Sequence, residues 1–445
     1  MGSVPRKELS LFDSTCLIVG IIIGAGIYET APTVASSVTH WWGVLALWIV
    51  GGLLSLAGAL CYAELASAYP REGGDYVYLS RAYGPWAGFM FGWIQLVIVR
   101  PGDIALMAFV FARYAQRLFG SPLETADPDS PYAMLVYAGA VVAVLTAINI
   151  LGVREGKWTQ NLLTVVKALG LLAILVAAIV APPDAPRVRN TEVLGSAPLS
   201  LALILVLFTF GGWNEMAYVA AEVKNPRRNI LRALVVGTVA VTMLYLLANA
   251  AFLYALGHTG MATSEAIAAD TIRAAFPRYG GRMISALICI SALGAINGLI
   301  FTGARISYAV GAEHKPFRLL GRWDDRTGTP IRALVVQAVI ALVLIVGLGS
   351  FQRTILYTAA AVYSFYFATS LSVIVLRRKE PHIDRPYKLT GYPFTVIIFC
   401  ASCAFLIYSA LIYKPKEAAI SCGIVLVGLV IYLVSRRRIS NSASA

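Results

Sequence analysis

Charged residues are what this sequence has little of. Of its 445 residues only 13% are charged, whereas 58% are apolar, and the mean hydropathy is +0.74. A soluble protein of this length has about one quarter charged residues. The shortage therefore excludes a soluble globular protein and indicates a chain that is largely embedded in a lipid bilayer.

Histidine is equally scarce, and with it the usual signs of catalysis. The four histidines are isolated and fall in or near short polar connections: His40, His258, His314 and His382. No metal-ligand spacing, nucleophile motif or phosphate-binding loop is present. The sequence therefore favours a protein that is not an enzyme and that has no cofactor and no metal site.

The six cysteines all lie in apolar segments: Cys16, Cys61, Cys289, Cys400, Cys403 and Cys422. None lies in an outer loop, where an oxidising compartment would allow a disulfide. Cys400 and Cys403 have the C-x-x-C spacing, but they have no histidine or further cysteine beside them, which favours simple packing.

Long apolar runs occupy the chain from end to end. A transmembrane helix needs about 20 apolar residues, and on that scale the sequence predicts an all-α membrane protein with twelve spans. The spans are 12–38, 42–68, 85–112, 132–151, 159–181, 198–221, 231–257, 283–311, 332–348, 354–376, 392–412 and 418–435. The polar connections are short, so one membrane transport domain is expected over 1–445. Small surface helices are predicted within 264–276 and 313–330.

The net charge of +13 follows membrane topology. If the N-terminus is inside, the inner connections receive more than twice as many lysines and arginines as the outer ones, including the Lys224–Arg232 cluster. This is the positive-inside bias. It predicts that both termini are cytoplasmic in a multi-pass protein of the cytoplasmic (inner) membrane, and it makes a nucleic-acid partner unnecessary.

Two spans are interrupted by glycine. The first contains "GIIIGAGIYETAP" (Gly20–Pro32), and the sixth contains "LFTFGGWNEMAYVAAEVKNP" with Gly211 and Gly212. Interrupted segments in matching positions are typical of two inverted halves that hold a substrate between the breaks. The alternative for the first span, a small-residue packing seam, is disfavoured by its third glycine, Gly26. We expect Gly24–Gly26 and Gly211–Gly212 to be non-helical and to face each other.

Each break exposes backbone groups that a bilayer cannot solvate. Amides at a half-helix N-terminus bind anions, and carbonyls bind cations. A ligand that carries a carboxylate beside an ammonium, such as an α-amino acid, fits both. The residues expected to contact this substrate are Ile22, Gly24, Ala25, Gly26, Ile27, Phe208, Thr209, Gly211 and Asn214. Asn214 either bonds the ligand or repairs the freed backbone.

These motifs resemble a known family. "GIIIGAGIY", "GGWNEMAYVAAEVKNPRRNI" and "LGAINGLIFTGARISYAVGAEHK" are similar to the amino acid–polyamine–organocation transporters. "VRPGDIALMAFVFARYAQRLF" is similar to the L-type amino acid transporters. The resemblance covers the first eight spans well and the last four weakly. It implies the leucine-transporter type of fold, with inverted five-helix repeats at about 12–181 and 198–376 and two extra helices at about 392–435.

The resemblance also implies roles for single residues. Phe208 matches an aromatic gate over the substrate. Lys167, in the fifth span, matches a lysine that stands where sodium-coupled relatives hold a cation, which implies sodium-independent transport. Ser291 or Asn297 would line the eighth-span side of this lysine. Tyr245 resembles a tyrosine near the substrate and the lysine, with ordinary packing as the alternative.

Three acids depart from the family pattern: Glu29, Asp103 and Glu215. Asp103 follows Arg100 by three residues, which predicts an ion pair on one helix face; otherwise Asp103 is, like Glu29 and Glu215, a possible selectivity residue. Glu29 and Glu215 have no evident partner. If they face the cavity, they favour a substrate with a second cationic group. If Glu29 lies at an outer vestibule, it only tunes access.

The heteromeric relatives attach a heavy subunit through a cysteine after the third span, and "GSPLETADPDS" has none. We therefore expect no disulfide-linked partner. The predicted function is sodium-independent exchange or facilitated uptake of α-amino acids, with neutral L-amino acids favoured. The alternatives are a cationic amino acid or polyamine transporter, proton-coupled in one variant, and an amino acid sensor that does not transport.

Overall fold

The computed structural model describes residues 7–120, 131–180, 197–275, 280–348, 351–413 and 423–435. Within these ranges the chain is helical, and its β-structure amounts to two isolated bridges, Leu9–Val223 and Asp324–Thr329. Six helices in these ranges are long and apolar enough to cross a membrane, or seven if one bent pair counts as a single span. Several shorter apolar helices accompany them. The chain is therefore a multi-pass helical membrane protein.

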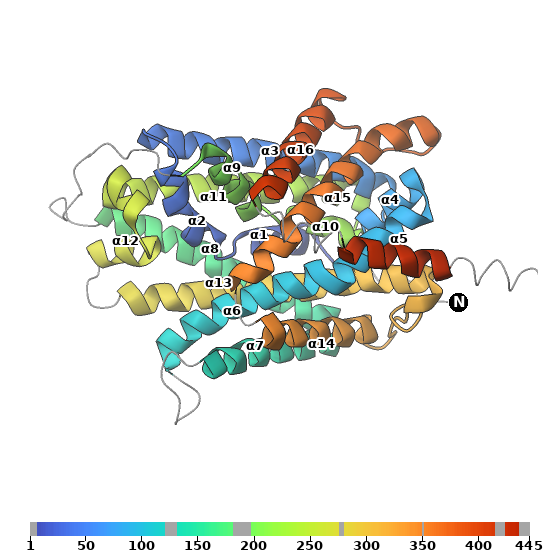
Figure 1. Cartoon of the computed structure of the whole chain (residues 1–445), viewed down its shortest axis with the longest axis horizontal. Helices are drawn as coiled ribbons and strands as arrows, with labels where there is room; N and C mark the ends of the chain where they lie inside the picture. Colours follow the sequence, from blue (N-terminus) through green and yellow to red (C-terminus); the bar gives the residue numbers. More distant parts are fainter. Residues whose placement is uncertain are drawn as a thin grey trace, which may run out of the picture.

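The following helices coincide with predicted spans, and one of them (226–263) is kinked at Gly257, where the backbone is not helical. They are α3 (Trp41–Ala68), α7 (Pro131–Leu151), α8 (Val153–Val180), α11 (Pro226–Thr263), α13 (Gly280–Glu313), α14 (Ile331–Leu348), α15 (Phe351–Lys379) and α16 (Phe394–Tyr413). A last apolar helix runs from Gly423 to Ser435. In Figure 1 most of these helices run roughly along one direction, and α15 and α16 cross them at an incline. Helix α13 packs mainly on α6, and α11 mainly on α3.

Three predicted spans are interrupted. The first consists of α1 (Leu11–Ile22) and α2 (Gly26–Ser36), bent by 51° at the break. The sixth consists of α9 (Leu199–Thr209), a turn, α10 (Glu215–Tyr218) and the 3₁₀ turn η2 (Ala220–Glu222). The glycines of the sequence predicted both of these interruptions.

The third span has an interruption that was not predicted. It consists of α5 (Pro85–Ile94), the π-helical turn η1 (Gln95–Val99) and α6 (Arg100–Phe119). Pro101 has no N–H to donate, and its ring would clash with the carbonyl four residues earlier. The wider π turn directly before it relieves that conflict.

The surface segments were predicted less well. Helix α12 (Ile267–Ala275) lies within the expected stretch 264–276, at the end of the molecule opposite to the N-terminus (Figure 1). The helix expected within 313–330 is wrong, because the structure has only the short η3 (Lys315–Phe317) followed by turns. Asp324 accepts hydrogen bonds from the amides of Arg326 and Thr327, which fixes a turn in place of a helix. Helix α4 (Asp75–Tyr83) was not predicted.

The described cysteines are buried free thiols: Cys16, Cys61, Cys289, Cys400 and Cys403. Cys422 lies outside the described residues, and so does the segment 121–130, where no disulfide-linking cysteine is expected. At the inner sides of the helices, small residues allow close packing. A Cβ atom on Gly294 of α13, for example, would lie 2.7 Å from Nζ of Lys167 on α8.

Candidate functional site

The break in the first span is three residues long. Helix α1 ends at Ile22, and α2 begins at Gly26, so Gly24 is non-helical as predicted whereas Gly26 is already helical. Among the described residues, the amides of Ala25, Gly26 and Ile27 have no hydrogen-bond acceptor. The positive end of α2 is therefore free to meet a negative group.

The break in the sixth span is longer and closes on itself. Its turn satisfies its own backbone: the amide of Gly211 donates to the Phe208 carbonyl at 2.9 Å, and that of Glu215 donates to Gly212 at 3.2 Å. Gly212 has φ +110°, a conformation that side chains rarely adopt, and a Cβ atom on it would lie 2.6 Å from Cγ2 of Ile21. Glycine is therefore required there by both conformation and space.

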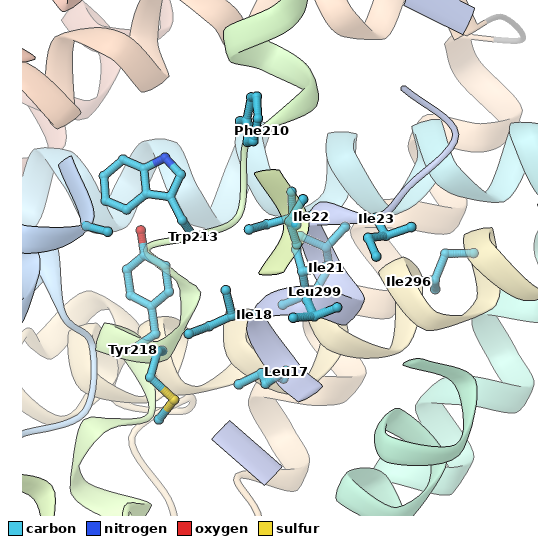
Figure 2. Close-up of a cluster of buried hydrophobic side chains, with 14 of the residues drawn as sticks. Leu17, Ile18, Ile21, Ile22, Ile23, Phe210, Trp213, Tyr218, Ile296 and Leu299 are labelled. Atoms are coloured by element: carbon cyan, nitrogen blue, oxygen red, sulfur yellow. The ribbon is translucent and has the colours of Figure 1, made fainter. Parts of the chain in front are cut away.

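The two breaks face each other, as predicted. A Cβ atom on Gly26 would lie 3.0 Å from Oγ1 of Thr209, and Thr30 in α2 shares a 3.2 Å hydrogen bond with the same Thr209 hydroxyl. Figure 2 shows the apolar packing around the breaks, where Ile21 and Ile22 lie between Phe210 of the second break and Leu299 of α13.

Lys167 is completely buried and lies beside the first break. Its ammonium donates to the carbonyls of Gly20 at 2.6 Å, Ile23 at 2.8 Å and Ser291 at 2.9 Å. The Ser291 hydroxyl also donates to the Ile23 carbonyl at 2.9 Å. An ammonium has three donors, and here each donor has an acceptor. Lys167 thus ties the end of α1 to α8 and α13.

Asn297 does not belong to this cluster. Its amide donates to the Gly156 carbonyl at 3.1 Å and to Oε1 of Gln160 at 3.0 Å, and its oxygen accepts from Asn149 at 2.8 Å. Of the two residues expected to line the α13 side of the lysine, the structure places only Ser291 there, because Asn297 lies farther along α13 and turns toward α7 and α8.

Tyr245 of α11 connects the two breaks. Its buried hydroxyl lies 2.8 Å from the Ile22 carbonyl and 3.4 Å from the Thr209 carbonyl. Its ring packs edge-on against Phe210 and Trp48. In the described part of the chain no hydrogen bond joins Tyr245 to Lys167. The tyrosine therefore supports the backbone of both breaks rather than the lysine.

A cavity of about 130 Å³ lies between the breaks and α6. The predicted site residues that line it are Ile22, Gly24, Gly26, Asp103, Phe208, Thr209, Gly211 and Glu215. Ala25, Ile27 and Asn214 are not in the lining. Asn214 instead donates to the Tyr218 hydroxyl at 2.7 Å and accepts from the Tyr366 hydroxyl at 2.9 Å, so it stabilises the turn and its surroundings.

The floor of the cavity is a buried ion pair that was not predicted. The Arg100 guanidinium donates to both carboxylate oxygens of Glu215 at 2.8 Å, and the side chains are only 3% and 5% exposed. Gln95 accepts from Nε of Arg100 at 3.0 Å, and the Thr302 hydroxyl donates to Glu215 at 2.6 Å. The predicted pair between Arg100 and Asp103 is wrong, because the Arg100 guanidinium instead pairs with Glu215 of α10. Glu215 is likewise not partnerless.

The sequence contained a signal for this pair. Buried charges inside a membrane almost always have a partner of opposite sign. Arg100 and Lys167 are the cations of the third and fifth spans, and Glu215 lies in the interrupted sixth span. Pairing the arginine of the third span with the glutamate of the sixth would have predicted the ion pair between Arg100 and Glu215.

The other two acids behave differently. Asp103 lines the cavity, is partly exposed to it, and has no hydrogen bond or ion pair with any described residue. Glu29 is exposed, is not in the cavity lining, and accepts at most a long 3.5 Å hydrogen bond from the Tyr114 hydroxyl. Its position agrees with the vestibule alternative.

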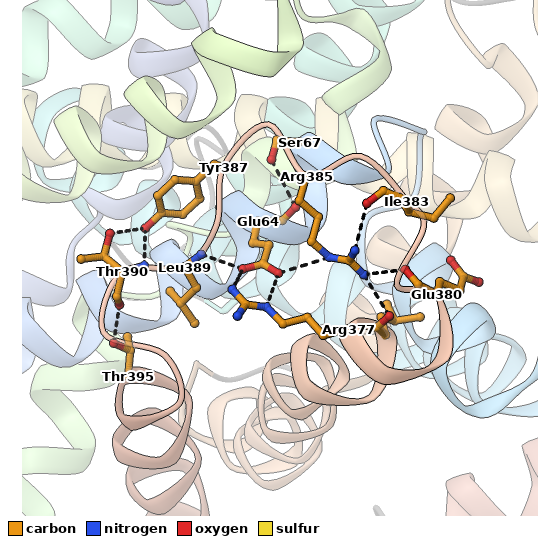
Figure 3. A network of polar contacts seen from close by, with 11 residues as sticks. Glu64, Ser67, Arg377, Glu380, Ile383, Arg385, Tyr387, Leu389, Thr390 and Thr395 are labelled. Carbon is orange, nitrogen blue, oxygen red and sulfur yellow. Dashed lines mark hydrogen bonds and ion pairs between the residues drawn. The ribbon is translucent and has the colours of Figure 1, made fainter.

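The end of the molecule near the N-terminus is held by further ion pairs. Glu222 of η2 pairs with Arg305 of α13 at 2.7 Å, and Asp13 of α1 lies 3.4 Å from Lys157 of α8. Figure 3 shows a third group, in which Glu64 of α3 contacts two arginines, Arg377 at 2.6 Å and Arg385 at 3.5 Å. These ion pairs join η2 to α13, α1 to α8, and α3 to both α15 and the segment that follows α15.

Backbone pairing joins the two interrupted spans at the same end. The amide of Leu9 donates to the Glu222 carbonyl at 2.9 Å, and the amide of Lys224 donates to the Leu9 carbonyl at 2.8 Å. The segment before α1 is thereby attached to the segment after η2.

Comparison with known proteins agrees with this architecture. The amino acid permease family matches residues 9–435. The b(0,+)-type amino acid transporter 1 of Mus musculus is 30% identical over 436 residues, which cover 96% of this chain and 88% of that protein. The large neutral amino acids transporter small subunit 2 of Homo sapiens is 30% identical over 452 residues, covering 97% and 81%. This chain is therefore a transporter rather than an enzyme, and it belongs to the amino acid permease family of the amino acid–polyamine–organocation superfamily.

Proposed function

We propose that the protein exchanges α-amino acids across the cytoplasmic membrane, or facilitates their uptake, by alternating access and without sodium, and that neutral L-amino acids are its main substrates. The observation that carries the proposal is the set of three free amides at the start of α2, beside a cavity formed by two facing helix breaks. Such amides, at the positive end of a helix, are suited to a carboxylate.

The substrate carboxylate binds the amides of Ala25, Gly26 and Ile27. Only their backbone is needed, which explains why the side chains of Ala25 and Ile27 can be buried away from the cavity. The substrate ammonium binds carbonyl oxygens at the breaks, those of Ile22, Phe208 and Gly211. A carbonyl oxygen has two lone pairs. The Ile22 and Phe208 carbonyls each accept two hydrogen bonds, whereas no described residue donates to the Gly211 carbonyl, which is therefore the freest acceptor of the three.

Sodium independence follows from the position of Lys167. Its fixed ammonium occupies the carbonyls of Gly20, Ile23 and Ser291, which are the kind of oxygen ligands that a sodium ion would need. Phe208 acts as the gate, since it lines the cavity directly before the second break. Tyr245 positions both breaks, and Asn214 supports the second.

The electrostatics of the floor favour neutral substrates over the cationic alternative. Arg100 neutralises Glu215, and Glu29 lies outside the cavity, so two of the three acids considered as selectivity residues have no free charge inside it. Of these three acids, only Asp103 has an unpaired carboxylate in the cavity lining.

The proposed architecture is a single membrane domain of twelve spans over 1–445. It has inverted repeats at about 12–181 and 198–376, extra helices at about 392–435, and both termini in the cytoplasm. The relative from Homo sapiens is named a small subunit. The segment 120–130 of this sequence contains no cysteine, so we propose that the chain works without a disulfide-linked partner.

Counterflow in proteoliposomes tests the function. Vesicles loaded with unlabelled alanine should accumulate labelled alanine equally well with sodium or with choline as the only salt cation. Competition by neutral amino acids should exceed competition by arginine and polyamines. Accumulation that requires sodium, or that occurs only with arginine, would contradict the proposal. The absence of any accumulation by folded protein would favour a sensor.

A further inference from the structure

One face of α6 forms a wall of the cavity. Its lining residues, together with the last residue of η1, are Val99, Arg100, Asp103, Leu106 and Met107, a spacing that places them on the same side of the helix. At one end of this face, Met107 lies beside the first break, since a Cβ atom on Gly24 would lie 3.8 Å from its sulfur. At the other end, Arg100 forms the floor. Asp103 lies between them.

The Asp103 carboxylate is a charged acceptor in the cavity wall that has no hydrogen-bond donor among the described residues. All three nitrogens of Arg100 are engaged, by Gln95 and by Glu215, and the Thr302 hydroxyl also donates to Glu215. No described residue donates to Asp103 itself. A polar group removed from bulk water without a partner is costly. When a substrate displaces water from the cavity, the substrate must supply the missing donor.

The position of Asp103 sets which part of the substrate reaches it. Residues four apart on a helix have Cβ atoms about 5–6 Å apart, so Asp103 is one helical turn beyond Met107 and the first break. A substrate anchored by its carboxylate at that break therefore brings the γ to ε atoms of its side chain to Asp103. The cavity lining also includes apolar side chains, among them Leu106, Leu207 and Val362.

We propose, on the basis of the function proposed above, that Asp103 is a specificity-determining residue. It accepts a hydrogen bond from the side chain of the substrate, and the transporter therefore prefers amino acids with a hydroxyl or N–H donor at the γ to ε positions over aliphatic amino acids of the same shape. Glutamine, asparagine and threonine have such donors, and their isosteres methionine, leucine and valine do not.

Competition against labelled alanine in counterflow tests this preference with three isosteric pairs: glutamine and methionine, asparagine and leucine, threonine and valine. In the wild-type protein the member of each pair that carries the hydrogen-bond donor should compete about tenfold better. This factor corresponds to the free energy of one hydrogen bond to a charged group. Asp103→Leu should abolish or reverse the preference. Asp103→Asn should retain part of it, because its amide oxygen still accepts.

A matched control removes a different acid. Glu29→Gln deletes an exposed carboxylate outside the cavity and should leave the ratio within each pair unchanged. Size-exclusion profiles of the purified variants show whether each one folds. If Asp103→Leu does not fold, Asp103→Ser, which keeps a small polar side chain, serves in its place and should lower the ratio.

The outcomes separate this inference from the proposed function. If alanine is exchanged but the members of each pair compete equally, Asp103 does not select the side chain and only this inference fails. It also fails if ornithine competes strongly while glutamine is no better than methionine, because charge pairing rather than hydrogen bonding would then decide. If alanine is not exchanged at all, the proposed function itself fails.

Discussion

The two helix breaks satisfy their freed backbone groups in different ways. The first, between α1 and α2, relies on groups from elsewhere: Lys167, Ser291 and Tyr245 all bind its carbonyls. The second, between α9 and α10, forms turns with its own amides and then anchors α10 to α6 through Glu215. The first break is therefore shaped by its surroundings, and the second mainly by its own sequence.

This difference has a physical reason. The first break is short. The amides of Ile23 and Gly24 donate to nearby carbonyls, but the amide of Ala25 and the first two amides of α2 have no acceptor among the described residues, and the carbonyls at the break depend on remote side chains. The second contains Gly211 and Gly212, and Gly212 adopts a positive φ that allows a compact turn. Changes at remote partners should therefore damage the first break, whereas local changes should damage the second.

The largest effect is expected for Lys167→Met. It removes one donor from each of the Gly20, Ile23 and Ser291 carbonyls, and only Ile23 keeps a side-chain donor, the Ser291 hydroxyl. A carbonyl left without a donor costs about 1–3 kcal/mol, so counterflow should fall at least about a hundredfold. The matched control is Lys157→Met, which removes a partly exposed pair with Asp13 and should retain most activity. Full transport by the Lys167 variant would show that the first break does not depend on its surroundings.

Glu215→Gln tests the anchor of the second break. It leaves the Arg100 charge buried and unpaired, which costs about 3–5 kcal/mol, so the thermal midpoint of the purified protein should drop by several degrees. The double variant Arg100→Gln, Glu215→Gln removes both charges and should recover much of the loss. If the double variant is no more stable than the single one, the charge pair between Arg100 and Glu215 does not stabilise the second break.

Gly212→Ala and Gly24→Ala distinguish a glycine that is needed for the fold of the second break from one that is needed for the substrate to approach the first. At Gly212 the methyl group meets Ile21 and an unfavourable φ, which costs about 1–3 kcal/mol and should appear as lower thermal stability. At Gly24 the nearest atom is 3.8 Å away, so stability should hold while the apparent KM for alanine rises. The reverse pattern would contradict the assignment of these two glycines.

The smallest effect is expected for Tyr245→Phe. It keeps the ring packed against Phe210 and removes one hydroxyl shared by the two breaks, at about 0.5–1.5 kcal/mol. Counterflow should fall by about two- to tenfold. A loss as large as that of the Lys167 variant would mean that Tyr245 contacts the substrate.

The sequence predicted the parts of the site that depend on local pattern. Glycines marked both breaks, and a lone lysine in an apolar span marked Lys167. It could not predict contacts set by helix direction. The Arg100 guanidinium pairs with Glu215 of α10 and not with Asp103, three residues along its own helix, and no local rule shows that choice of partner. Asn297 was misplaced for a similar reason, since α13 turns it away from Lys167.

The pairing of Leu9 with residues 222–224 has a consequence for kinetics. Two main-chain hydrogen bonds join the start of α1 to the end of η2, so neither half-helix can swing away without carrying the other or breaking both bonds. We therefore expect the start of the first interrupted span and the end of the sixth to move together, so that opening at this end of the molecule follows one rate constant.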